Sequence, residues 1–221
     1  MSGGHDHDHD HGHDHDHART FQPDDDAGGL TQHMALVAAL RALLIEKGIY
    51  SGEDERRAIE RMDARSPAAG ARLVARAWVD ADYRAHLLAD GAAAARELGV
   101  EVGPTRLIVV ADTAEEKNVI VCTLCSCYPR WVLGLPPAWY KARAYRARVV
   151  VEPRAVLAEF GTTLPEGMVV RVHDSTADMR YMVLPARPEG TQGWDEEALA
   201  AIVSRDCMIG VALPCPSVAA A

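Results

Sequence analysis

The first third of the chain carries an apolar pattern with helical spacing. In residues 32–47 apolar side chains recur three or four positions apart, at Met34, Val37, Leu40 and Leu44, and Gly48 follows them. Such spacing places an apolar stripe along a helix, and a glycine directly after the stripe is a usual helix end. The pattern therefore predicts an apolar helix over residues 32–47.

Four further short helices are predicted between residue 51 and Gly99. Their starts are marked by residues that favour helix N-termini: Ser51 with Asp54 as a capping box, Ser66 with Pro67, Asp80 or Asp82, and Asp90. These helices cannot cover all the apolar surface of the first one. Residues 30–102 are therefore interpreted either as an arm that wraps a partner subunit or as a helical layer on this chain's own sheet.

From Arg106 onward the pattern changes to short runs rich in β-branched residues. Buried strands are predicted at residues 107–111 and 118–122, a hairpin-like pair at 168–173 and 178–184, and a last strand at 209–213. Helices are predicted at residues 139–150 (one or two short ones), 154–160 (closed by Gly161) and 195–206. The mixture of segments predicts an α+β fold class.

Charge and composition narrow the function classes. Residues 1–26 contribute −7 of the net charge of −9, so the remainder carries only −2 and offers no basic face for nucleic acid. No apolar run is long enough to span a membrane and no secretory signal pattern is present, so we expect a cytoplasmic location without membrane contact. Three of the five cysteines cluster in one short stretch, which argues against a secreted disulfide framework.

Histidine and aspartate alternate near the N-terminus. The seven imidazoles belong to His5, His7, His9, His11, His13, His15 and His17. Residues 5–17 have no apolar side chain to bury, so residues 1–29 are predicted to form a disordered tail. Imidazoles interleaved with carboxylates bind Co(II), Ni(II) or Zn(II), which suggests accessory metal capture for delivery to a second site. A solubilising tail and a remnant of metal tolerance are the alternatives.

The candidate chemistry lies in residues 121–127, Val-Cys-Thr-Leu-Cys-Ser-Cys. Cys125 and Cys127 flank one serine, so their thiolates and the deprotonated backbone nitrogens of Ser126 and Cys127 can bind one metal ion together. With Cys122 below that plane, the sixth octahedral position is free for water or substrate. These strong donors suit a small trivalent ion, and an open position on a Lewis-acidic metal is what hydration or hydrolysis requires.

Three simpler interpretations compete with that site. A structural zinc ion needs four ligands, and Cys207, Cys215 or His173 could supply the fourth. A redox C-x-x-C pair is the second interpretation, although Cys122 follows a strand without the helix start that lowers a thiol pKa. The third is an iron–sulfur site, which normally needs a fourth cysteine at matching spacing. Cys207 is also explained as a small buried hydrophobic residue.

Beginning with these cysteines, the sequence resembles the nitrile hydratase alpha subunit. The resemblance extends from roughly Leu30 to Pro214, and five further segments carry it: 133–137 (LGLPP), 139–141 (WYK), 145–150 (YRARVV), 180–185 (RYMVLP) and 205–212 (RDCMIGVA). It implies a layered α-β-β-α core. We therefore expect a metal-binding catalytic domain at residues 103–215, preceded by the helical arm at 30–102 and followed by a short tail at 216–221.

The resemblance implies a role for each residue of the cysteine loop. Cys122 would be the axial thiolate, Cys125 a sulfinate and Cys127 a sulfenate. Ser126 and Cys127 would give their amide nitrogens, and Cys125, Ser126 and Cys127 would be the catalytic set. Relatives with threonine at the position of Thr123 mostly carry cobalt, which implies one low-spin Co(III) per subunit, with Fe(III) as the alternative. The implied activity is hydration of a nitrile to an amide.

The same resemblance implies supporting residues and partners. Arg180 and Asp174 would support the loop or contact the partner; otherwise they are a strand charge and a turn residue. Arg130 and Trp131 would line the substrate pocket, where relatives usually have Trp-Pro, and many relatives carry a glutamine where this chain has Gly103. The cysteine oxygens would need arginines from a beta subunit, giving a heterodimer or heterotetramer, and an activator protein would insert the metal.

Three functions therefore stand as hypotheses. The leading one is the alpha subunit of a cobalt nitrile hydratase. The metal subunit of a thiocyanate hydrolase, which has the same type of loop, is the nearest alternative, because the polar Arg130 suits a small anion. The third is a zinc-structured or metal-storing interaction protein without catalysis.

Overall fold

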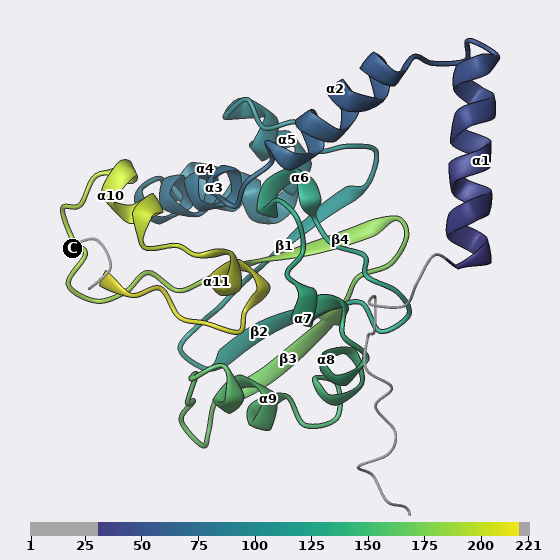
Figure 1. Ribbon diagram of the computed structural model, residues 1–221. Coiled ribbons are helices and arrows are strands. Elements are labelled where there is room, and N and C mark those ends of the chain that lie inside the picture. Colours follow the sequence, from purple (N-terminus) through teal and green to yellow (C-terminus); the bar gives the residue numbers. More distant parts are fainter. Residues whose placement is uncertain (1–30, 217–221) are drawn as a thin grey trace, which may run out of the picture.

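The computed structural model describes residues 31–216, which form two small sheets stacked between two groups of helices (Figure 1). The layers are α3 (Ala68–Val79), α4 (Ala81–Ala89) and α5 (Gly91–Glu97); the sheet of β1 (Arg106–Ala111) and β4 (Met179–Leu184); the sheet of β2 (Glu116–Val121) and β3 (Val169–Asp174); and α7 (Ala138–Lys141), α8 (Arg143–Arg148) and α9 (Pro153–Glu159). The predicted α+β class with α-β-β-α layers is confirmed.

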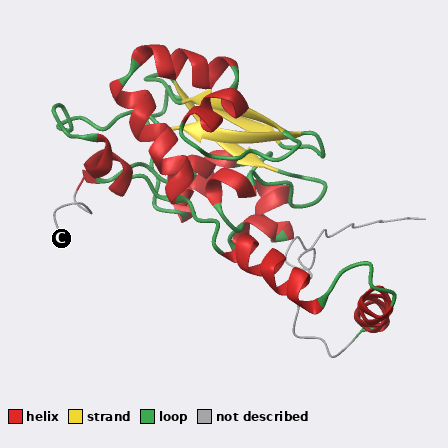
Figure 2. Ribbon diagram, turned by 90° about the horizontal axis from the view of Figure 1, so that it is seen from above, coloured by secondary structure: helices red, strands yellow, loops and turns green. Residues whose placement is uncertain are grey.

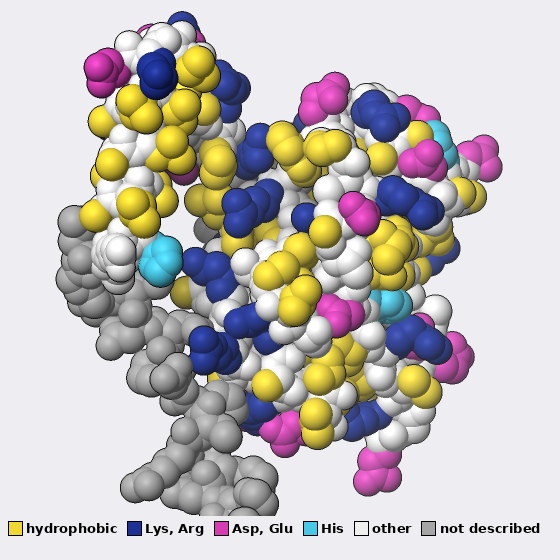
Figure 3. All heavy atoms as spheres, turned by 90° about the vertical axis from the view of Figure 1, so that its right-hand side faces the viewer, with side chains coloured by type: hydrophobic (Ala, Val, Ile, Leu, Met, Phe, Trp, Pro, Cys, Tyr) yellow, Lys and Arg dark blue, Asp and Glu magenta, His cyan; other side chains and the backbone are white. Residues whose placement is uncertain are grey.

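The helices α1 (Gln32–Glu46) and α2 (Gly52–Asp63) project from this layered body (Figure 2). Neither helix contains a buried residue. The predicted capping box is present at the start of α2, where Ser51 and Asp54 bond reciprocally. Figure 3 shows apolar side chains exposed along the arm and Lys and Arg side chains on the body beside it. The sequence predicts residues 30–102 to be either an arm or a helical layer on the chain's own sheet. The first interpretation applies to α1 and α2.

The helices α3, α4 and α5 form a layer on the chain's own sheet, as the second interpretation proposed. They bury side chains such as Leu73 and Leu87 completely. Asp80 and Asp90 cap α4 and α5 as predicted, each accepting a backbone N–H bond at 2.9 Å. The predicted cap of α3 is wrong: Pro67, already in helical dihedral angles, occupies the N-cap position, so Ser66 does not.

The predicted hairpin of the two later strands is also wrong. β3 pairs in parallel with β2 and β4 pairs in parallel with β1, so the two strands belong to different sheets. Ser175 directs this crossing, because its N–H bonds to Val121 O at 2.7 Å and holds the chain against β2 after β3 has ended. Periodicity identified both strands, but their partners depend on contacts distant in sequence.

The C-terminal segment differs from its prediction in two places. The predicted helix at 195–206 is divided into α10 (Glu196–Ala201) and α11 (Arg205–Ile209), because Ser204 caps a new helix through Cys207 N–H. The predicted strand at 209–213 is absent. Gly210 has φ 97° and ends α11, and a Cβ there would lie 2.1 Å from Asn118 O. The first apolar residues of the predicted strand are therefore buried because the backbone at Gly210 lies close against β2, and the segment forms no strand.

The segment that follows the cysteine loop is held firmly on the body. The short helix α6 (Arg130–Leu133) packs against α3 at Gly70, where a Cβ would lie 2.9 Å from Val132 O. The helices predicted at 139–150 and 154–160 are confirmed as α7, α8 and α9, and Gly161 follows the last of them with φ 81°.

Within residues 31–216, none of the helices has the length and apolar composition that a membrane span needs.

Candidate metal centre

The cysteine loop begins where β2 ends. β2 and β3 are parallel and in register at Val121 and Asp174, so the carboxyl ends of both strands meet at one edge. The Asp174 carboxylate therefore reaches the start of the loop. It accepts hydrogen bonds from the Thr123 N–H at 3.0 Å and from the Thr123 hydroxyl at 2.5 Å. Two charge-assisted bonds therefore fix Thr123, the residue that directly follows the first cysteine of the loop.

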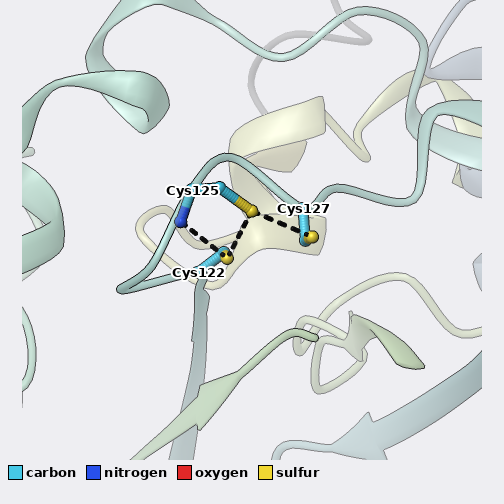
Figure 4. A group of neighbouring side chains, drawn as sticks. All are labelled: Cys122, Cys125 and Cys127. Carbon is cyan, nitrogen blue, oxygen red and sulfur yellow. Dashed lines mark hydrogen bonds between the residues drawn. The ribbon is translucent and has the colours of Figure 1, made fainter. Parts of the chain in front are cut away.

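The loop turns three thiols toward one another (Figure 4). The Sγ atoms of Cys122 and Cys125 are 3.4 Å apart, and those of Cys125 and Cys127 are 3.2 Å apart. The Cys125 N–H also donates to Cys122 Sγ at 3.3 Å. Cys122 is buried whereas Cys125 is exposed, so the cluster has an inner and an outer side. A set of three converging thiols with one open side fits a metal that keeps a position free for a further ligand.

A fourth protein ligand of the zinc type does not join this cluster. Among residues 31–216, the His, Cys, Asp and Glu ligand atoms that lie within 4.8 Å of one another at this site are the three sulfurs alone. His173 instead bonds Asn118 Oδ1 through Nε2 at 2.7 Å, and the Cys207 thiol contacts the Ser204 hydroxyl at 3.2 Å. The arrangement therefore departs from the four-ligand pattern of structural zinc sites.

The pKa values of Cys125 and Cys127 are shifted in opposite directions. Hydrogen bonds from Cys127 and then from Cys122 lower the pKa of Cys125 to about 7. Burial, followed by the hydrogen bond with Cys125, raises the pKa of Cys127 to about 12. Cys125 thus ionises before Cys127, and a bound cation would be needed to deprotonate Cys127 near neutral pH.

Two buried tyrosines anchor the loop and the strand below it. The Tyr140 hydroxyl donates to Cys127 O at 2.9 Å, and the Tyr145 hydroxyl donates to Ile120 O at 2.7 Å. The rings also contact each other, with centroids 5.7 Å apart. Burial raises the pKa of both hydroxyls, which keeps them protonated and able to donate. The end of the cysteine loop and the strand that leads into it are therefore held from the α7–α8 side.

A pocket of about 380 Å³ opens over the cysteine loop. It is lined by Arg65, Thr105, Cys125, Ser126, Cys127, Tyr128, Arg130, Trp131 and Arg180. The structure thus brings Arg130, Trp131 and Arg180 to one pocket with the loop. Asp174 lies at the start of the loop and is not part of this lining. Arg180 is oriented by bonds to the backbone oxygens of Thr176 and Met179.

Sequence reasoning missed Arg65 and Thr105. Arg65 lies in the connection between α2 and α3, and Thr105 precedes β1, both far from the cysteines in sequence. The one available signal was Gly103, because a missing side chain indicates that another group approaches the backbone there. That group is Trp131. The histidines predicted to capture metal, His5 to His17, lie outside the described residues.

Comparison with known proteins places these features in a family. The family model described as "Nitrile hydratase, alpha chain" matches residues 31–212. A nitrile hydratase subunit alpha from Rhodococcus sp is 50% identical over 180 residues, covering 80% of this chain and 90% of that protein. A thiocyanate hydrolase subunit gamma from Thiobacillus thioparus is 48% identical over 195 residues, covering 83% and 80%.

Solved structures give the same grouping. A recombinant thiocyanate hydrolase comprising partially modified cobalt centres superposes with a TM-score of 0.79 at 45% identity, covering 86% of this chain and 93% of that one. An Fe-type nitrile hydratase double mutant from Comamonas testosteroni Ni1 superposes with a TM-score of 0.77 at 42% identity, covering 82% and 90%. The resemblance noted in the sequence is confirmed, and the chain belongs to the nitrile hydratase alpha-chain family.

Proposed function

We propose that this chain is the metal-binding subunit of a cytoplasmic enzyme that adds water across the carbon–nitrogen triple bond of a small substrate, with a nitrile as the first candidate. The observation that carries the proposal is the convergence of three thiols from one anchored loop beneath an open pocket. A cytoplasmic location suits this loop, because a reducing compartment keeps its thiols free until a metal is inserted.

The chain would hold one metal ion through Cys122, Cys125 and Cys127 and through the amide nitrogens of Ser126 and Cys127. Cobalt is the first candidate, in line with cobalt-containing relatives from Rhodococcus rhodochrous and Pseudonocardia thermophila, and iron is the alternative, in line with the Fe-type structure. When bound, a trivalent ion would supply Lewis acidity and lower the pKa of a coordinated water.

The residues of the pocket would orient the substrate and handle its protons. We propose that Cys125 is a sulfinate and Cys127 a sulfenate in the mature enzyme. The oxygen on Cys127 would either attack the substrate carbon or take a proton from the attacking water. Arg180 faces Cys127 closely enough to favour its ionised form, so it would also stabilise negative oxygens there. Intact-peptide mass spectrometry checks this assignment, with two added oxygens on Cys125 and one on Cys127.

A partner subunit would complete the enzyme. The relatives are named as subunits, and α1 and α2 expose apolar side chains that the rest of residues 31–216 does not cover. We propose a beta subunit that receives this arm in a heterodimer or heterotetramer, and an activator protein that inserts the metal. The His/Asp tail would capture metal first, so deletion of residues 5–17 would lower cobalt occupancy when cobalt is limiting.

Thiocyanate is the second candidate substrate, and one observation favours it. Arg65, Arg130 and Arg180 line the pocket, and its lining contains no carboxylate. A cluster of like charges in a partly enclosed site raises the local concentration of anions. Thiocyanate carries the same carbon–nitrogen triple bond as a nitrile, together with a negative charge.

The deciding experiment is an assay of the assembled, cobalt-loaded complex on acrylonitrile and on thiocyanate. Release of acrylamide supports the first candidate, and turnover of thiocyanate alone replaces it with the second. Metal analysis of the tail-deleted protein tests the non-catalytic alternative. One equivalent of zinc on unmodified thiols, with no turnover of either compound, would refute the enzymatic function.

A further inference from the structure

Trp131 occupies space that only a glycine at position 103 leaves free. A Cβ on Gly103 would lie 2.4–2.5 Å from three atoms of the Trp131 ring. Such distances are well inside van der Waals contact, so any other residue at position 103 would displace the ring. Gly103 therefore determines where Trp131 lies, and Trp131 forms one wall of the pocket over the cysteine loop.

Trp131 in turn places Arg65. The guanidinium carbon of Arg65 lies 3.6 Å from the centre of the Trp131 ring, a stacking distance at which a cation is attracted by the ring face. The backbone of Arg65 is fixed from the same side. A Cβ on Gly134, the residue after α6, would lie 2.9 Å from Arg65 O. Both the main chain and the side chain of Arg65 are thus positioned by the segment that follows the cysteines.

Arg65 lines the pocket and forms no ion pair with a carboxylate among residues 31–216. Several surface arginines, including Arg41, Arg56 and Arg148, form ion pairs with glutamates. In the part of the chain that the structure describes, Arg65, Arg130 and Arg180 form none, and all three line the same pocket. Unpaired cations that converge on one cavity are typical of a site for an anion.

We propose that Arg65 is a specificity-determining residue that selects a small monovalent anion, such as thiocyanate, and that Gly103 and Trp131 act as positioning residues for it. This inference rests on the proposed function and selects the anionic one of its two substrates. Arg65 adds a charge at the mouth of the pocket that a neutral nitrile does not use. Its effect therefore appears in substrate preference more than in the rate of the chemical step.

The first test compares Arg65→Gln with wild type in the assembled, cobalt-loaded complex. We expect kcat/KM for thiocyanate to fall about fivefold, mainly through KM, and kcat/KM for acrylonitrile to change less than about twofold. Arg84→Gln is the matched control, because Arg84 is exposed on α4, outside the arm and outside the pocket lining. Equal losses for both substrates, or no loss for either, would overturn the proposal.

The second test moves Arg65 without removing its charge. Gly103→Ala should displace Trp131 and thereby give the same selective rise in KM for thiocyanate, with kcat changed less than KM. Gly167→Ala is the control, because Gly167 lies outside the arm and a Cβ there meets nothing within 4 Å. Thermal unfolding separates positioning from simple destabilisation. A Gly103→Ala complex that keeps its wild-type thiocyanate KM contradicts the positioning role.

A third measurement is independent of turnover. Iodide should quench the fluorescence of Trp131, obtained as the difference between wild type and Trp131→Phe, because Arg65 concentrates anions beside the ring. Arg65→Gln should reduce this quenching by roughly half, while quenching by neutral acrylamide stays the same. If wild type turns over neither substrate, the proposed function fails, and the iodide result alone decides the inference. Equal iodide quenching in both proteins would refute it.

Discussion

The cysteine loop and the α1–α2 arm are built in opposite ways. The loop is bonded from several directions: by Asp174 at Thr123, by Tyr140 at Cys127, and by Arg146, which donates to Thr123 O at 3.4 Å. The arm buries nothing, and Val37 and Leu40 on α1 are 67% and 56% exposed. The chain thus organises the candidate ligands by itself and leaves a large apolar surface for another molecule.

Exposed apolar surface of this extent is costly in water, and a monomer gains nothing from it. Within the arm, the contact that joins its two helices is polar: Arg41 Nε donates to Glu55 at 2.7 Å. This exposed pair links α1 to α2 without covering their apolar side chains. The cysteine loop is therefore organised within this chain, whereas the apolar side chains of the arm stay exposed and suit the partner subunit proposed above.

The largest effect is expected from Cys122→Ser. Cys122 is the innermost thiol of the cluster, and its sulfur accepts the Cys125 N–H bond, so its loss removes both a ligand and a support of the loop. We expect metal content in the purified complex to fall more than about tenfold. Elemental analysis measures it, and Cys215→Ser, a cysteine outside the cluster, is the control. A fully metallated Cys122→Ser protein would mean that the loop is not the metal site.

Assembly with the partner subunit should depend on the arm, whereas the thermal stability of the isolated chain should not. In the double variant Val37→Asp/Leu40→Asp, we expect co-purification with the partner subunit to be lost, because two charges would be placed in the apolar contact. The thermal midpoint of the isolated chain should shift by less than about 2 °C, since both positions are exposed. Leu73→Ala in buried α3 is the contrasting variant and should cost about 2–5 kcal/mol of unfolding free energy. An arm variant that still assembles would remove the partner role from α1.

A smaller effect is expected when only the support of the loop is removed. Asp174→Ala deletes both hydrogen bonds to Thr123 but leaves every cysteine in place. Because groups that orient metal ligands contribute substantially to affinity, we expect metal to bind about 10- to 100-fold more weakly. Competition between the apo complex and a chelator for Co(II), which exchanges quickly, measures this change, and Asp178→Ala in the following turn is the control. Unchanged affinity would show that the loop keeps its shape without β3.

The parts of this comparison that sequence could predict are the local ones. The capping box of α2, the caps Asp80 and Asp90 and the cysteine spacing each depend on a few adjacent residues, and all were identified. The pairing of β3 with β2 was missed because strand partners are chosen across about fifty residues of chain. Arg65 was missed for the same reason, since its position in the pocket depends on stacking against Trp131, which is distant from it in sequence. The exposed arm could be expected from the sequence, because the four short helices predicted after residue 51 cannot cover all the apolar surface of the first helix.

The smallest effect concerns the pH dependence of the support beneath the loop. Burial, and then the charge of Arg171, lower the pKa of His173, although Glu116 acts in the opposite direction. The native state therefore prefers neutral His173, so stability is complete above the unfolded-state pKa of about 6.5 and declines as the pH falls below it. His173→Gln, which can still bond Asn118, should flatten this acid-side decline of the thermal midpoint by a degree or two. His33→Gln on exposed α1 is the control for the arm. If His33→Gln flattened the decline and His173→Gln did not, the acid-sensitive element would lie in the arm and not beneath the cysteine loop.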